Sequence, residues 1–297
     1  MSHAPSLDWS KFNAVFVTRH AMQSERIHDL YRKNLKILQQ IPYPKCHLQD
    51  PPALEYIILA IEQLKDSYDW IINIDDDAFL MDFDALYRLM EHMHEHQYDI
   101  CGMADGLTLT PRDVFNPVSM NPFFNVIRTE PFRTRFTDRQ SMLARYDPSE
   151  HIKIVPIEMY HPEIWQKSAD QITGHEFPSS YEPYYSFFHG VLPKLKVLWL
   201  YGKSYDYDKT VNPNDVFVSD EPRRARTWYK YKKGILYEND PWTTVLYNHE
   251  RVPFVYHTWY ARNYGHGEDP TLPLIRNVDR IDRIYALACE KLGFVAQ

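Results

Sequence analysis

The chain has 297 residues, of which 44% are hydrophobic and 25% are charged, and its formal net charge is −7. This hydrophobic content can build one large core or two small ones. Proteins whose main task is to hold a nucleic-acid backbone usually carry a basic excess, so the charge of the whole chain argues against that class and leaves room only for a local basic patch.

The first third of the chain alternates between short apolar runs and amphipathic stretches. Runs typical of strands buried on both faces occupy residues 13–18, 70–74 and 98–103. Apolar residues at helical spacing predict helices over residues 24–40, 53–69 and 82–96. The proline-containing stretch 41–52 breaks this pattern. This order predicts an α/β fold with a mainly parallel central sheet flanked by helices.

The rest of the chain is less regular. Strands are predicted over 121–129 and 195–201, and helices over 179–192 and 272–294. From residue 206 to the closing helix, the sequence is typical of loops with short elements. Because no low-complexity linker or internal repeat divides the chain, we expect one domain, with its second half laid over a crevice in its first half.

Three consecutive aspartates, Asp75, Asp76 and Asp77, follow the apolar run at 70–74 directly. Ligands of parallel α/β sheets bind at the carboxyl ends of the strands, which is where this motif would lie. Adjacent carboxylates repel one another, and a hard divalent cation relieves that repulsion while keeping phosphate oxygens in its shell. The motif therefore predicts a metal site that holds a diphosphate, with a solvated acidic turn as the alternative.

The stretch 70–80, "WIINIDDDAFL", resembles the hallmark of the GT-A superfamily of nucleotide-sugar glycosyltransferases, an apolar strand that ends in Asp-x-Asp. The resemblance extends over roughly residues 13–262. It implies a GT-A, Rossmann-like fold and the metal-dependent transfer of a sugar from a nucleoside-diphosphate sugar, with a UDP-sugar expected. Within a single domain 1–297, residues 1–120 would bind the nucleotide, 121–270 the acceptor, and 271–297 would form a C-terminal helix.

The resemblance also implies roles for the aspartates. Asp77 would coordinate Mn²⁺ or Mg²⁺, Asp75 would share that ion and contact the nucleotide, and Asp76 would lie near the donor sugar. Three aspartates in a row leave the register open by one residue. His257, after the strand-like "PFVY", is the predicted third ligand, because imidazole suits Mn²⁺. A hydrogen-bonded core histidine is the alternative, and His266 is the fallback ligand.

Four further residues are assigned to the nucleotide by the same resemblance. Thr18 and Arg19 end the first predicted strand, and Arg26 lies shortly after them. Arg262 follows the candidate histidine, and a guanidinium matches the geometry of a diphosphate. For the arginines near the first strand, a solvated position at a helix start is an equal alternative.

An inverting transfer needs a general base to deprotonate the acceptor hydroxyl. Glu182 is the predicted base, because it stands just before Pro183 at a predicted helix start. The same sequence also fits a capping box, in which the glutamate holds backbone N–H groups. Glu176 and Asp170 are weaker candidates, and a retaining enzyme would need no such base.

Two other sequence patterns are typical of different ligand sites. His92 and His96 stand one helical turn apart, a spacing that binds metals but more often marks a solvated helix face. Basic and aromatic residues alternate over 222–233, a pattern that more often marks a solvated surface but could also bind nucleic acid or anionic glycans, or close as a lid over the donor. The competing functions are a non-catalytic glycan- or nucleic-acid-binding module and another metal-phosphate enzyme, a nucleotidyltransferase or a phosphatase.

The acceptor is open at this stage: a glycan, a lipid-linked sugar, a protein or a modified nucleobase all fit. The cysteines, Cys46, Cys101 and Cys289, lack metal-ligand spacing, which favours reduced thiols. The first residues lack an apolar stretch, and no apolar run is long enough to cross a bilayer. We therefore expect a cytoplasmic protein without a transmembrane segment.

Overall fold

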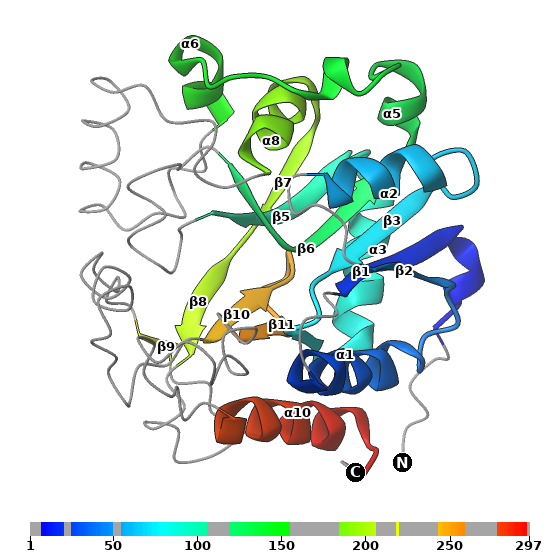
Figure 1. The fold of residues 1–297 in the computed structure, drawn as a ribbon, viewed down its shortest axis with the longest axis vertical. Coiled ribbons are helices and arrows are strands. Elements are labelled where there is room, and N and C mark those ends of the chain that lie inside the picture. Colours follow the sequence, from blue (N-terminus) through cyan, green and yellow to red (C-terminus); the bar gives the residue numbers. More distant parts are fainter. Residues whose placement is uncertain are drawn as a thin grey trace.

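The computed structural model describes residues 7–20, 25–49, 55–105, 119–154, 184–205, 218–219, 243–258 and 278–295. Within these ranges the chain forms an α/β structure with helices on both sides of a central sheet (Figure 1). The predicted fold class is confirmed. The single-domain organisation stays a prediction.

The central sheet has six strands in the order β2-β1-β3-β6-β5-β7. Their bounds are β1 Ala14–His20, β2 Lys45–Gln49, β3 Trp70–Ile74, β5 Ile100–Ala104, β6 Met120–Arg128 and β7 Val197–Leu200. The pairs β1–β2, β1–β3 and β5–β7 are parallel, whereas β6 runs antiparallel to both β3 and β5. The sheet is thus mainly parallel, with one reversed strand next to the strand that precedes the aspartates.

Strand β2 corrects the sequence analysis, which interpreted residues 41–52 only as a break. Lys45–Gln49 pairs in parallel with the second half of β1. Prolines flank this strand but are absent from it, so every residue within it can donate to a ladder. Only Leu48 of this edge strand is buried, so the strand carries no continuous apolar run for a pattern search to find.

Helices cover the two faces of the sheet in two groups. Their bounds are α1 Glu25–Leu38, α2 Tyr56–Leu64, α3 Phe83–Glu95, α5 Glu130–Thr134, α6 Pro148–His151, α8 Tyr185–Val191 and α10 Val278–Leu292. Apolar residues of α1, α3 and α10 share one core with Ala14 and Phe16, while those of α2, α5 and α8 share another with Val15 and Val17. Successive residues of β1 therefore face opposite cores, as the two-residue period of a strand requires.

A second, antiparallel sheet was not anticipated. It has the order β4-β11-β10-β8-β9, with bounds β4 Ala78–Leu80, β8 Gly202–Tyr205, β9 Val218–Ser219, β10 Thr243–Tyr247 and β11 Pro253–Thr258. Strand β4 begins directly after the three aspartates and pairs with β11, so that Ala78 lies opposite His257. This pairing brings a late segment of the chain to the end of β3.

The C-terminal helix α10 packs against α1, and both lie below the central sheet in the view of Figure 1. Lys33 of α1 joins Asp282 of α10 at 2.5 Å, and the rings of Phe79 and Tyr285 lie 6.1 Å apart. Helix α10 starts at Val278, within the helix predicted from 272. In the described part of the chain, the helices are too short or too polar to cross a bilayer.

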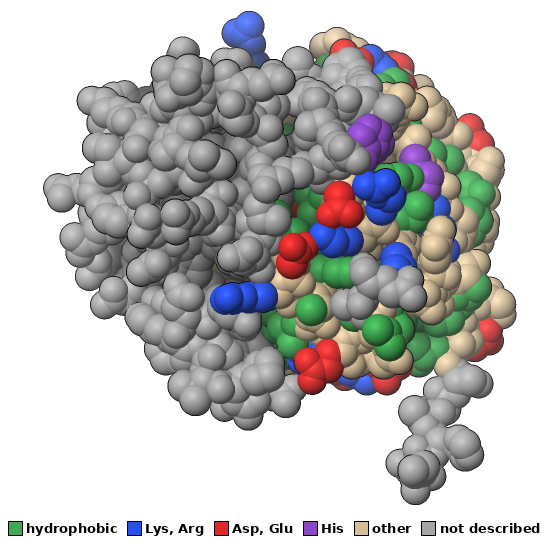
Figure 2. All heavy atoms as spheres, turned by 60° about the horizontal axis from the view of Figure 1, so that its bottom comes forward, with side chains coloured by type: hydrophobic (Ala, Val, Ile, Leu, Met, Phe, Trp, Pro, Cys, Tyr) green, Lys and Arg blue, Asp and Glu red, His purple; other side chains and the backbone are tan. Residues whose placement is uncertain are grey.

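Charged side chains of both signs are interspersed over the described part of the face that Figure 2 presents. Lysine and arginine do not gather there into one basic surface. This distribution agrees with the net charge of −7. The basic segment 222–233 lies outside the described residues, so its predicted role stays a prediction.

Candidate metal site

Residues 75–78 form a turn that connects β3 of the central sheet to β4 of the second sheet. The turn is closed by the Ala78 N–H, which donates to the Asp75 carbonyl at 3.1 Å. The Asp75 N–H donates to the carbonyl of Phe123 in β6 at 2.9 Å. From α1, the side-chain amide of Asn34 donates to the carbonyls of Asp75, at 3.1 Å, and of Ala78. The acidic turn is therefore fixed at the carboxyl end of β3, as the sequence predicts.

The far end of the turn is held by β11. Both the N–H and the hydroxyl of Thr258 donate to the Asp77 carbonyl, at 2.9 and 2.8 Å. This contact places the preceding residue, His257, beside the aspartates. Its Nε2 lies 3.3 Å from Oδ1 of Asp77, and both residues are 5% exposed.

Asp75, Asp77 and His257 each offer one ligand atom, and these atoms all lie within 4.8 Å of one another. Among the described residues, no other group of three or more histidine, cysteine, aspartate or glutamate side chains meets this condition. Two carboxylate oxygens and an imidazole nitrogen form a donor set that suits Mn²⁺. The structure thus brings together the three residues that were predicted as metal ligands.

Carboxyl groups lie close together at this site and repel one another. Asp76 is fully buried, and burial together with the neighbouring charges of Asp77 and Asp75 raises the pKa of its carboxyl group well above the usual range. Arg19, which lies on β1, opposes this rise in the pKa of Asp76. Its guanidinium lies 5.2 Å from the centre of the Tyr56 ring. Burial by itself would lower the pKa of Arg19, but the nearby aspartates raise it overall. A bound cation would relieve the repulsion among the carboxylates.

The other predicted residues divide into two sets. Thr18 is fully buried in β1, next to the half-buried Arg19, and Arg26 lies in the first turn of α1. The remaining candidates fall outside the described residues: Arg262, His266, Asp170, Glu176, Glu182 and Pro183. Their roles stay predictions.

Three residues that support the site were missed by the sequence analysis: Asn34, Phe123 and Thr258. Asn34 stands on the buried stripe of α1 between Leu30 and Leu38, and it is only 1% exposed. A lone amide on an apolar stripe is the one available signal, since a buried amide needs partners. The contacts of Phe123 and Thr258 depend on strand pairing across the chain, which no local pattern encodes.

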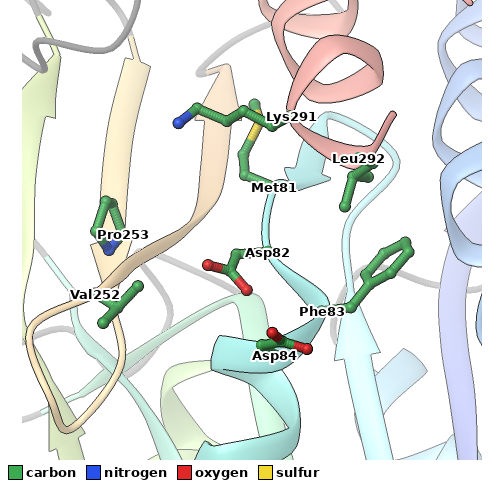
Figure 3. A pocket seen from close by; sticks show the side chains of 8 residues that line it. All are labelled: Met81, Asp82, Phe83, Asp84, Val252, Pro253, Lys291 and Leu292. Carbon is green, nitrogen blue, oxygen red and sulfur yellow. The ribbon is translucent and has the colours of Figure 1, made fainter. Parts of the chain in front are cut away.

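A pocket of about 540 Å³ lies elsewhere, between the loop after β4, the start of β11 and the end of α10. Figure 3 shows Asp82 and Asp84 on one side and Lys291 extending from α10 on the other. Asp82 accepts from the Ala85 N–H at 2.8 Å and so caps α3. None of the three candidate ligands lines this pocket, and we assign it no role in the site.

No family model matches the chain, and no curated protein matches it. Solved structures do match, and those described below have low identity to this chain. The mannosyltransferase PcManGT from Pyrobaculum calidifontis, in complex with GDP-Man and Mn²⁺, is 10% identical with a TM-score of 0.33, over 59% of this chain and 68% of that chain. The catalytic domain of Drosophila β1,4-galactosyltransferase 7, in complex with xylobiose, is 13% identical with a TM-score of 0.29, over 59% and 69%.

A glycosyltransferase involved in the glycosylation of the major capsid of PBCV-1 is 11% identical with a TM-score of 0.28, over 40% of this chain. This chain spans 61% of the length of that structure. All three proteins are glycosyltransferases, the class that the acidic motif resembles. Because the identities and TM-scores are this low, these likenesses carry no argument about function, which rests on the geometry of the site and on the acidic motif.

Proposed function

We propose that this chain is a metal-dependent glycosyltransferase that uses a nucleoside-diphosphate sugar as its donor. The observation that carries this proposal is the convergence of Asp75, Asp77 and His257 at the carboxyl end of β3, with their ligand atoms within 4.8 Å of one another. Parallel α/β sheets bind their ligands at such an edge. A UDP-sugar is the expected donor.

Asp75, Asp77 and His257 would hold Mn²⁺ or Mg²⁺. When bound, the ion neutralises the charge that develops on the leaving nucleoside diphosphate. Neighbouring residues of this chain would bind and orient the donor around the ion. Arg19, supported on the Tyr56 ring 5.2 Å away, would contact the nucleotide from the neighbouring strand β1.

Further roles follow the resemblance to GT-A enzymes. Thr18 and Arg26 would line the nucleotide side, and Arg262 would pair with the diphosphate. Asp76 would lie near the donor sugar. Glu182 would act as the general base toward the acceptor hydroxyl in an inverting transfer. The acceptor would be a glycan, a lipid-linked sugar, a protein or a modified nucleobase, and the reaction would take place in the cytoplasm.

The test is a donor hydrolysis assay with a panel of nucleotide sugars, in Mn²⁺ and in EDTA. We expect one donor to release its nucleoside diphosphate only with the metal. In Asp77→Asn this release should fall by at least about a hundredfold, because a charged ligand is lost. Asp147→Asn changes an exposed aspartate that caps a turn through Ser149, and it should retain the activity.

Other outcomes would favour the other functions. Nucleotide-sugar binding without release under any metal would support a non-catalytic binding module. Release of inorganic phosphate or pyrophosphate instead of a nucleoside diphosphate would support a phosphatase or a nucleotidyltransferase. Release that persists in EDTA, or in Asp77→Asn, would contradict the metal-dependent mechanism.

A further inference from the structure

Phe123 of β6 contacts two of the three candidate ligands, each through a different part of the residue. Its carbonyl accepts the Asp75 N–H at 2.9 Å, where the acidic turn leaves β3. Its ring stacks on the imidazole of His257, with centroids 4.3 Å apart and planes 9° from parallel. Phe123 is 1% exposed, so both contacts lie within the packed interior. One residue therefore spans the gap between the acidic turn and β11.

The backbone of His257 is already fixed by its neighbours in the second sheet. It lies opposite Thr244 of β10 on one side and Ala78 of β4 on the other. Strand pairing does not fix the rotation of the imidazole about its side-chain bonds, because the terminal torsion of histidine is broad. The flat ring of Phe123 restricts this rotation and leaves the Nε2 edge directed at Asp77, 3.3 Å away.

We propose that Phe123 is a positioning residue for the metal site, which sets the orientation of His257 as a ligand. This inference rests on the proposed function, because it requires that His257 binds the metal. The face of a phenyl ring carries negative charge density, and a cation above it is attracted. An imidazole gains positive character when its nitrogen binds a metal ion. The stack should therefore be more favourable with the ion bound than without it.

Phe123→Leu is the matched substitution, because it removes the ring but keeps an apolar side chain and the carbonyl that accepts from Asp75. The neighbouring Phe124 supplies the control. It is fully buried in the same strand, and its ring meets Phe254 of β11 edge-on at 5.1 Å. Phe124→Leu thus removes an aromatic contact between the same two strands without touching a candidate ligand.

The measurement is Mn²⁺ binding to the purified chain, followed by the electron paramagnetic resonance signal of free Mn²⁺, with thermal unfolding of each variant alongside. We expect Phe123→Leu to bind Mn²⁺ about three- to tenfold more weakly than the wild type, the range that one aromatic contact supplies. Phe124→Leu should bind within about twofold of the wild type, although a similar aromatic contact is lost. If Phe123→Leu does not fold, Phe123→Met takes its place, since methionine fills irregular space.

A His257→Ala variant separates the two ideas. If His257→Ala loses Mn²⁺ affinity but Phe123→Leu binds as Phe124→Leu does, the positioning role of Phe123 is wrong and the metal site stands. If the wild type does not bind Mn²⁺, or if His257→Ala binds it as well as the wild type, the metal site of the proposed function fails, and the inference fails with it.

Discussion

Buried carboxylates lie at opposite ends of the central sheet, one at the amino end of β5 and three at the carboxyl end of β3, and their surroundings differ. At the amino end of β5, Asp99 meets Arg128 at 2.9 Å and Arg135 at 3.6 Å, and it accepts from the Lys196 N–H at 3.0 Å. At the carboxyl end of β3, three aspartates all interact electrostatically with one arginine, Arg19. The first carboxylate is balanced by the protein itself.

The difference separates a structural carboxylate from one that is arranged for a ligand. A buried charge that serves only the fold needs a partner and hydrogen bonds within the chain. Carboxylates that lie this close together repel one another and cost stability, and such strain is typical of functional sites. The comparison makes opposite predictions for the same kind of mutation at the two ends of the sheet.

The largest effect should come from Asp99→Ala. Removing this buried carboxylate leaves the half-buried Arg128 with Glu130 and Gln97 as partners and leaves the Lys196 N–H without its acceptor, and breaking a buried pair in this way costs roughly 3 kcal/mol. Chemical denaturation of the wild type and the variant would measure the loss. Asp69→Ala, which breaks a more exposed pair with Arg133 and leaves the other hydrogen bonds of Arg133 in place, should cost less than about 1 kcal/mol and serves as the control. Equal losses in the two variants would remove the distinction drawn for Asp99.

A second prediction concerns His189, a buried ionisable group of helix α8. Burial lowers the pKa of His189 from 6.5 to about 3, and His151 lies against it with ring centroids 4.9 Å apart. Below pH 6.5 the unfolded chain binds a proton that the folded chain does not, so the folded state loses stability as the pH falls. At pH 5 the loss is about 2 kcal/mol relative to neutral pH.

Denaturation curves at pH 7 and pH 5 would measure this change in the wild type and in His189→Gln. The glutamine does not titrate, so the variant should lose less stability between the two pH values, whatever its stability at pH 7. The same pH dependence in both proteins would mean that other groups cause the loss.

The smallest effect should come from Asp76→Asn, and its sign should be the reverse of the first. The substitution removes a carboxyl group whose ionisation is opposed by burial and by Asp77 and Asp75, so the metal-free protein should become more stable, by at most about 1 kcal/mol. Thermal unfolding in EDTA would show the gain. A destabilisation as large as that of Asp99→Ala would mean that Asp76 is a structural carboxylate, and the comparison would fail.

Much of the central sheet could be predicted from the sequence. Continuous apolar runs indicated β1, β3 and β5, and helical periodicity indicated α1, α2 and α3, because these elements are buried along whole faces. Strand β2 and the second sheet could not be found in this way. The strand β4 has three residues, and its identity as a strand comes from pairing with β11 much later in the chain.

The candidate site likewise combines residues that could be predicted from the sequence with residues that could not. The aspartates are local to one strand end, so their position followed from the sequence alone. That His257 meets them was expected from the resemblance to GT-A enzymes, together with its position after the strand-like run 253–256. Asn34, Phe123 and Thr258 act through packing and strand pairing, which become visible only once the two sheets are placed side by side.

The acidic turn is also a connection between the two sheets. Residues 75–77 are the whole covalent connection between β3 in one sheet and β4 in the other. The bonds from Thr258 to the Asp77 carbonyl close the same connection from a position 181 residues later. A cation held by Asp77 and His257 would add a third tie at this point. Removing the ion with a chelator should therefore speed amide hydrogen exchange in β11, which carries His257, before it speeds exchange in β1. Strand β1 belongs to the central sheet and lies two strands away from the reversed strand β6.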